Sequence, residues 1–570
     1  MLFYYICFAL KELSTYTYKG LLLPSYIRKK SSFFSELWSL LIQKLMPRYY
    51  EDNDIRAVIH NKVNYRDLWH EVECLNNKCR EEKQSIGATI RRDALVSFNE
   101  LASIINGEQQ NLYIKERLDR LQLHSVFISG MPESKDRIEM ISRQLGLLQE
   151  NVQKIKKSFK SYGTNVQLSY RLAKLNSDVA LAGYILRLCH PEVKIEEIQE
   201  ILEELIRIER ENNKISHFIK SKLKILTRTI VEHNTNTGGK YIADNRKEYY
   251  KILWASIIGG FFIAIFALFK IYIESWGFSL LGEGLLFGLN YALCFILVDL
   301  LGGIIATKQP AMTANTFLSK VVIYDDKRKT RKRIAGLVAD VSKSQFISFV
   351  GNLSLAFIFS YAVSKIYVLI TGESLFEQDK AKYLLDKNNI SISLALLYAA
   401  IAGVFLSLSG FIAGYFDNAV LYFQLQKRID KNYADRKSLS VFYGGLIKRL
   451  GKLFGSISLG FFLGLSGAIG LFSGIPFDIR HVAFSSSHIA YGSQVSDMSW
   501  FSQLGLVMCL SIFTIGLVNF LVSFLITMVV ALKAKDLKMK DILMGFLYAI
   551  KVLILKPWIF ILPKGFNYFK

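Results

Sequence analysis

The chain has little proline, little charge and few cysteines. Its 570 residues include 8 prolines and 21% charged residues, whereas an average soluble protein has about 5% proline and about 25% charge. The six cysteines are spread along the whole length, so the sequence predicts neither a disulfide framework nor a metal site. The shortage of proline instead favours long, uninterrupted helices.

The common enzyme signatures are also absent. The sequence has no G-x-x-x-x-G-K-[ST], no strand followed by G-x-G-x-x-G, no H-E-x-x-H and no G-x-S-x-G, which argues against P-loop, dinucleotide-binding, zinc-protease and α/β-hydrolase sites. We therefore predict no cofactor and no metal, assign no catalytic residue, and leave open whether the protein is an enzyme. No internal repeat of fixed period is visible.

What the chain has in quantity is apolar residues and positive charge. Hydrophobic residues make up 51%, the mean hydropathy is +0.25 and the net charge is +23. Most of that excess charge lies after residue 248, in the more apolar part of the chain. Membrane spans joined by basic cytoplasmic loops explain this combination, although nucleic-acid binding would also use positive charge.

The pattern divides the chain into three regions. Residues 1–248 are mostly polar and helix-periodic, with apolar residues at three-and-four spacing in 193–230, and nothing there alternates with the period of a strand. We predict a cytoplasmic helical domain over 1–248, a transmembrane domain over 249–541, and an amphipathic or interfacial tail over 542–570. The predicted fold is all-α.

Six apolar segments in the second region are long enough to cross a bilayer. They are Ile252–Phe269, Gly284–Ala306, Phe346–Ser364, Leu394–Phe416, Leu453–Ile475 and Leu504–Ala531. The segments predict a polytopic bundle of six spans whose main partner is the lipid bilayer.

Basic residues alternate between the loops that join these spans. They crowd between spans two and three, as in the run KRKTRKR at 327–333, between spans four and five, and after span six, while the other loops are poor in them. Because positive loops stay in the cytoplasm, the predicted topology has both termini inside, in a bacterial inner membrane. The basic loops could also bind nucleic acid.

A few polar residues stand in or beside the predicted spans. Span two carries Asn290 and Asp299 and is followed by Lys308 and Gln309, and span four ends at Asp417 and Asn418. An ionisable residue in a span usually faces a cavity or a partner, so Asp299 is either a functional group or the partner of Lys308.

The segment after span five, GIPFDIRHVAFSSSHIAY at 474–491, is predicted to be an outer loop. It holds Asp478, Arg480, His481 and His488, which could hold an anion, transfer a proton or pair with one another. Spans four and five also carry small-xxx-small faces, Gly410 with Gly414, Gly460 with Gly464 and Gly470 with Gly474. Such faces pack helices closely, within the chain or between copies in a homo-oligomer.

Five blocks of the sequence contain long, distinctive motifs. They are 231–249, 306–317, 342–352, 402–418 and 474–491, and they include ATKQPAMT and IPFDIRHVAFSS. These blocks resemble a known family, the bacterial polytopic proteins labelled site-specific recombinase. The resemblance implies a membrane protein and, by its label, DNA strand exchange.

The first block departs from the family. Glu232, His233, Thr237, Gly238 and Tyr241 match it, whereas Thr235-Asn236 and Gly239-Lys240 stand where the family has a Gly-Glu and a Glu-His pair. A metal or acid–base role that needs all of those side chains is therefore not carried over to Glu232 and His233.

Three interpretations of function remain open. The first is an integral inner-membrane protein of this family, with a biochemical activity that the sequence does not reveal. The second is a membrane-tethered, DNA-binding recombinase, although neither a Tyr nucleophile with its Arg partners nor a Ser nucleophile with clustered Arg can be recognised. The third is a transporter or channel, with Asp299, Asn290 and the Asp478–His481 segment along its path.

Overall fold

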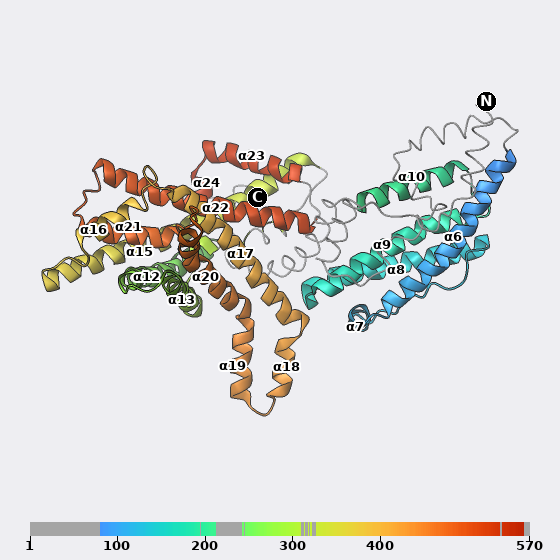
Figure 1. Cartoon of the computed structure of the whole chain (residues 1–570), viewed down its shortest axis with the longest axis horizontal. Coiled ribbons are helices and arrows are strands. Elements are labelled where there is room, and N and C mark those ends of the chain that lie inside the picture. The colour runs from blue at the N-terminus through green and yellow to red at the C-terminus, as the bar shows by residue number, and fades with distance from the viewer. Residues whose placement is uncertain are drawn as a thin grey trace. The chain divides into compact units, whose positions relative to one another are not determined.

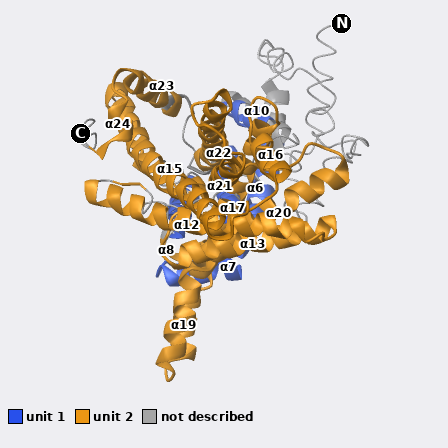
Figure 2. Cartoon of the chain, turned by 90° about the vertical axis from the view of Figure 1, so that its left-hand side faces the viewer, with its two compact units in different colours: residues 1–159, 165–226 blue, residues 160–164, 227–570 orange. Residues whose placement is uncertain are grey.

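The computed structural model describes residues 80–193, 195–212, 242–243, 245–308, 313, 317, 320–321, 326–535 and 539–563. Every regular element in these residues is a helix (Figure 1), which confirms the all-α prediction. The chain divides into two compact units, one of residues 1–159 and 165–226 and the other of residues 160–164 and 227–570 (Figure 2).

The first unit contains polar helices around an apolar core. They are α6 (Arg80–Gln109), α7 (Leu112–Arg120), α8 (Lys135–Tyr162), α9 (Val166–Leu188) and α10 (Ile195–Asn212). Asn111 and Asn165 cap α7 and α9 by accepting hydrogen bonds from backbone N–H groups of the first turn. Buried aliphatic and aromatic residues recur at helical spacing, for example Phe98, Leu101 and Ile105 on α6.

The second unit is built on six long apolar helices. They are α12 (Arg246–Ser275), α13 (Leu280–Leu300), α15 (Lys327–Thr371), α17 (Ala395–Tyr422), α20 (Leu450–Ser473) and α22 (Gln503–Lys535). All six are long and apolar enough to cross a bilayer, in agreement with the six predicted spans. They indicate a multi-pass membrane protein.

Shorter helices connect or cover the six. They are η4 (Ala306–Lys308), α16 (Gln378–Asp386), α18 (Leu425–Asn432), α19 (Lys437–Lys448), α21 (Val482–Val495), α23 (Met539–Leu555) and α24 (Trp558–Ile561). Helices α18 and α19 form a hairpin that projects from the unit (Figure 1). Helices α23 and α24 pack on α15 around Ala335 and Ala339, and the interfacial position of this tail stays a prediction.

The bundle has two ends, which are defined here by the ends of α13. We call the end at which α12 finishes and α13 begins the 275 end, and the end at which α13 finishes the 300 end. Helix α20 runs antiparallel to α13, because Gly288 lies against Phe461 and Gly464, and Gly284 against Ala468. Helix α15 runs parallel to α12, since Ser348 bonds Ser256 and Phe359 packs on Phe261.

The prediction that 474–491 is an outer loop is wrong for most of this segment. Residues 482–495 form α21, which is buried almost throughout. Its serines donate to backbone carbonyls of α15, Ser486 to Leu353 at 3.3 Å and Ser487 to Ala356 at 3.5 Å. Hydropathy misses such a helix because its surroundings are protein rather than lipid.

The second unit contains the same arrangement twice. Helices α12 and α13, a turn at 301–308 and α15 are followed by α17 and α20, a turn at 474–481 and, after the additional helix α21, α22. Each set has three long helices, so the chain leaves the first set at the end opposite to the one where it entered. The second set therefore runs in the opposite direction to the first, as in inverted-repeat membrane proteins.

Matching hydrogen bonds support this correspondence. The Asn352 side chain of α15 accepts from the Ala306 N–H at 2.7 Å and donates to the carbonyls of Ile304 and Ser256. Asn519 of α22 makes the same three bonds in the second set, to the Val482 N–H at 3.0 Å and to the carbonyls of Arg480 and Ala399.

The agreement extends to the neighbouring backbone. Ile304 donates to the Ala255 carbonyl at 2.8 Å, and Arg480 donates to the Tyr398 carbonyl at 3.1 Å. Ala255 and Tyr398 each precede the residue whose carbonyl the asparagine amide binds. These matching bonds indicate that the two sets of helices form an inverted repeat, although the sequence has no fixed period.

Candidate functional site

A large polar cavity opens at the 275 end. Its volume is about 750 Å³, and its walls come from α12, α13, α16, α20, α21 and the 474–481 segment. The charged residues among its walls are Lys270, Glu274, Glu283, Lys387, Asp478 and Arg480, and the buried His481 and His488 also line it. The cavity is thus lined by many ionisable groups although it lies among apolar helices.

Two ion pairs neutralise part of this charge. Arg480 binds Asp478 at 2.5 Å and donates to the Lys387 carbonyl at 2.8 Å, and its guanidinium lies 5.1 Å from the Tyr398 ring. Glu274 binds Lys380 at 2.8 Å. The predicted cluster of Asp478, Arg480 and His481 therefore lies at the wall of a cavity rather than in an open loop.

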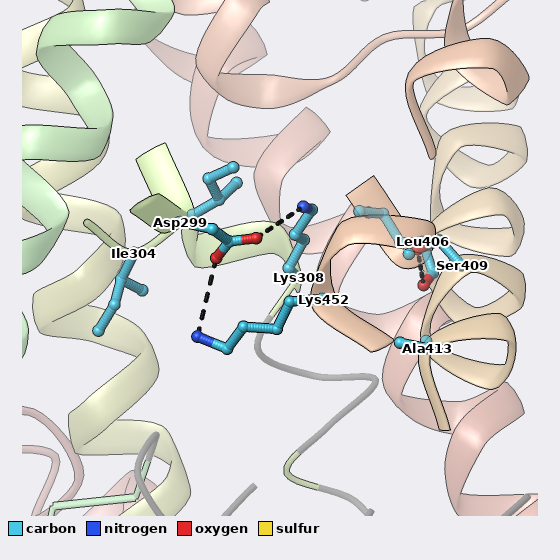
Figure 3. A pocket seen from close by; sticks show the side chains of 10 residues that line it. Asp299, Ile304, Lys308, Leu406, Ser409, Ala413 and Lys452 are labelled. Atoms are coloured by element: carbon cyan, nitrogen blue, oxygen red, sulfur yellow. Dashed lines mark hydrogen bonds and ion pairs between the residues drawn. The ribbon is translucent and has the colours of Figure 1, made fainter. Parts of the chain in front are cut away.

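A small second pocket lies near the 300 end, between α13, α17 and α20 (Figure 3). Asp299 stands in its wall between two lysines, with Lys308 and Lys452 each 3.9 Å from the carboxylate. The Ser456 hydroxyl donates to Asp299 at 3.0 Å and accepts from Lys308 at 2.8 Å. The Asp299 charge is thus compensated where it would otherwise be costly in a span.

The cavity and the pocket come closest to each other at a small group of buried side chains between His481, which lines the cavity, and Lys308, which lines the pocket. The Thr307 hydroxyl and His481 Nε2 are 2.7 Å apart, and the His481 ring lies 5.9 Å from the Phe295 ring. Thr307 and His481 are each 1% exposed, and Phe295 is fully buried. We call these three side chains the barrier. Lys308, which lines the small pocket, directly follows Thr307 in the chain, and its Nζ lies 4.6 Å from the centre of the Phe295 ring.

The barrier is made where the two turns meet. Residues 301–308 fold back against α13, with the Gly303 N–H bonded to the Val298 carbonyl at 2.8 Å. Residues 474–481 run from the 275 end to the level of Phe295, where α21 begins and turns back. Backbone without helical bonds is tolerated at such depth only where it lies inside protein or lines a cavity.

The remaining predicted residues have other positions. Asn290 donates to the Phe266 carbonyl at 2.9 Å and joins α13 to α12 without lining either space. Asp417 lies against Gly451 at the 300 end of α17, and the Asn418 side chain accepts from the Thr164 N–H at 2.9 Å. Gln309, Glu232 and His233 lie outside the described residues.

Several lining residues were missed from the sequence. The sequence predicts Lys270 in a loop, because the predicted first span ends at Phe269, but α12 continues to Ser275. Lys270 is half-buried and donates to the Tyr291 hydroxyl at 3.1 Å. The apolar residues on both sides of it, in ALFKIYI, could have indicated an intramembrane lysine. Lys387, Lys452 and Ser456 carried no such signal.

One small-residue face on α20, Gly460 with Gly464, packs inside the chain. A side chain added at Gly464 would meet the backbone of Gly288, and one at Gly460 would meet Ala292, so this face brings α13 and α20 into backbone contact. Gly470 instead lies against the Phe477 carbonyl, and Gly474 ends the helix where an added side chain would meet no atom within 4 Å. The homo-oligomer stays a prediction.

Among the described residues, no group of three His, Cys, Asp or Glu side chains could hold a metal ion.

Comparison with known proteins gives one family and no closer relative. Neither the curated proteins nor the solved structures contain a match to the chain. The family model described as Site-specific recombinase matches residues 130–563, a range that contains both spaces and the barrier. The chain therefore belongs to the site-specific recombinase family.

Proposed function

We propose that this protein is a membrane carrier, which moves a small polar solute by opening the cavity and the pocket alternately. The proposal rests on two spaces at opposite ends of one bundle, each lined by charged residues, which approach each other at the barrier. A polar solute in the cavity would pass the barrier to reach Lys308 and Asp299.

The inverted repeat supports a carrier rather than a fixed pore. In transporters of this construction, the two repeats exchange conformations, so that the site opens first to one side and then to the other. Here the two turns have matching bonds to Asn352 and Asn519 but different surroundings, since the cavity at the 275 end is large and the pocket at the 300 end is small. We infer that this state is open at the 275 end.

The charge distribution supports an orientation in a bacterial inner membrane. Exposed basic residues gather at the 300 end, on the first turns of α15 and on the α18–α19 hairpin, whereas Glu373, Glu377 and Asp379 lie beyond the 275 end. By the positive-inside rule the 300 end faces the cytoplasm. The cavity then opens to the outer side.

Two-sided labelling of the barrier tests the proposal. Thr307→Cys, in a chain without its native cysteines, should react with a membrane-impermeant methanethiosulfonate both in right-side-out and in inverted vesicles. A carrier exposes its barrier to each side in turn. Ser407→Cys is the matched control, because Ser407 is fully buried on α17 and lines neither space.

The outcomes separate the alternatives. Labelling of position 307 from both sides, with no labelling of position 407, is the expected result. A thiol at position 307 that is protected from both sides, or that reacts from one side only, contradicts a carrier.

A second candidate function comes from the family description and one surface. Strand exchange requires DNA binding, and the start of α15 exposes Lys327, Arg328, Lys329, Lys332 and Arg333. Contacts from these residues to phosphates would make binding of the full chain to duplex DNA fall steeply with salt. Replacement of the five by Gln should remove that salt-dependent binding if this candidate is correct.

A further inference from the structure

We infer that the large cavity binds a small organic anion, held between Lys270, Lys387 and the first turns of α21. This inference rests on the proposed carrier function and names the class of its solute. The class would be a metabolite that carries a carboxylate or a phosphate group on an apolar or hydroxylated body.

The first step is the charge that remains after pairing. Arg480 and Glu274 are each neutralised, by Asp478 and Lys380. Lys270 and Lys387 line the cavity and have no carboxylate within ion-pair distance among the described residues. Lys270 instead contacts the Tyr291 hydroxyl and the Phe287 ring, and Lys387 lies 4.7 Å from the Tyr383 ring.

The single acid left over is Glu283, which lies in the first turn of α13 at the 275 end. Asp478 and Glu274 also lie in the field of Lys270, but no acid among the described residues forms an ion pair with Lys270 or Lys387, so both lysines can bind a ligand. Lysines without an ion pair in a poorly solvated site favour an anionic ligand, whose charge would offset the burial that lowers the pKa of Lys387 to about 7.

The second step is a pair of histidines without full hydrogen bonding. His481 is 1% exposed and His488 is 5% exposed, and both line the cavity. His481 Nδ1 and His488 Nε2 are buried and have no hydrogen-bond partner among the described residues. A buried polar atom without a partner is costly, so a ligand oxygen is the natural partner of a ring N–H at either position.

The backbone adds to the same preference. The 14-residue helix α21 begins directly after His481, so its positive end faces the same space. His488 also lies in the field of Lys387, Lys270 and Arg480. Cations from α12, from the segment after α16 and from the 474–481 turn thus converge with one helix terminus.

The third step is the shape of the walls. Phe287, Tyr291, Tyr383, Tyr398 and Phe484 supply aromatic surface, and Gly464 and Gly467 leave room beside it. A volume of about 750 Å³ exceeds what an inorganic ion needs and falls in the range of metabolite sites. The site therefore fits an organic anion better than chloride or free phosphate.

The test measures the sign of the field inside the cavity with two small thiol reagents. Ser485 lines the cavity and is 3% exposed. Ser485→Cys, in a chain without its native cysteines, is treated with the anionic reagent 2-sulfonatoethyl methanethiosulfonate and with its cationic trimethylammonium counterpart. The ratio of the two rates is compared with that at Ser473→Cys, an exposed position at the same end.

We expect the anionic-to-cationic ratio to be about tenfold higher or more at position 485 than at position 473. Lys270→Gln together with Lys387→Gln should bring the ratio close to that of position 473. Lys382→Gln, an exposed lysine on α16, is the matched control and should leave the ratio unchanged. Lys387→Arg keeps the charge and should preserve the ratio, which separates loss of field from loss of fold.

A ratio at position 485 that equals that of position 473, or that favours the cationic reagent, overturns the anion site. So does a ratio that the two Gln substitutions leave unchanged, and so does a thiol at position 485 that neither reagent reaches. Failure of the carrier proposal is seen separately, since a thiol at position 307 that is not labelled from both sides can coexist with a high ratio at position 485. The protein would then bind an anion without moving it.

Discussion

The two asparagines that hold the turns give the sharpest prediction about stability. Asn519 is fully buried and makes three hydrogen bonds, to the Val482 N–H at 3.0 Å, to the Ala399 carbonyl at 2.8 Å and to the Arg480 carbonyl at 3.0 Å. Asn519→Ala removes all three bonds and leaves buried backbone groups without partners.

The expected loss follows from the count of bonds. Each hydrogen bond contributes about 0.6 kcal/mol in membrane proteins and up to about 1.5 kcal/mol in proteins in general. The free energy of unfolding should therefore fall by about 2–5 kcal/mol. Asn352→Ala should lose a similar amount, because Asn352 makes the three equivalent bonds in the first repeat.

Asn290→Ala is the matched control. Asn290 is a buried asparagine of the same bundle but makes one such bond, to the Phe266 carbonyl at 2.9 Å, so its loss should be about 1 kcal/mol. Equilibrium unfolding of the full chain in mixed micelles with a rising fraction of sodium dodecyl sulfate measures all three variants. If Asn519→Ala and Asn352→Ala cost no more than Asn290→Ala, the two asparagines do not hold the turns.

Four further predictions follow from packing, charge and burial. Gly464→Leu should destabilise by at least about 1–3 kcal/mol, because α13 must move away, while Gly445→Leu, whose site has no atom within 4 Å, should keep its thermal midpoint in detergent. Asp299→Asn should destabilise, and adding Lys308→Gln should restore part of the loss, since an uncompensated charge is then removed; a double-mutant cycle that is additive would exclude the pair. Reporter fusions after Arg333 and Lys437 should be cytoplasmic and a fusion after Asp379 external; the reverse result would invert the orientation. Burial raises the pKa of the fully buried Cys189 thiol to about 12. Iodoacetamide should therefore leave Cys189 unmodified at pH 8 in the folded chain and modify it after denaturation. The contribution of the neutral thiol to stability is present below the unfolded pKa of about 9 and is lost as the pH rises through the folded pKa.

Much of the scaffold was predictable because it depends on hydropathy. Length and composition decide whether a helix can span a bilayer, so the six long helices follow from the sequence. The pairing of Asp299 with Lys308 was also a legible alternative, since an unpaired carboxylate in a span is costly and a lysine follows nine residues later.

The site itself was less legible, because its main parts face protein rather than lipid. Helix α21 contains three consecutive serines and a histidine, and only tertiary contacts with α15 make such a segment buried. Lys270 lies in a helix that hydropathy ends too early, and Lys387 reaches the cavity from outside the spans. The inverted repeat is carried by bonding geometry around Asn352 and Asn519, and the sequences around them share no fixed spacing.

Distances between spin labels at both ends of the protein in lipid would show whether the two spaces open alternately. One pair of labels replaces the exposed residues Leu281 and Lys382 at the 275 end, and the other replaces the exposed residues Arg333 and Lys448 at the 300 end. Alternate opening predicts two distance populations for each pair, with the short distance at one end accompanying the long distance at the other. Addition of an anionic probe such as succinate should change the proportions of the two populations. A single unchanged distance for both pairs, with and without succinate, would contradict alternate opening.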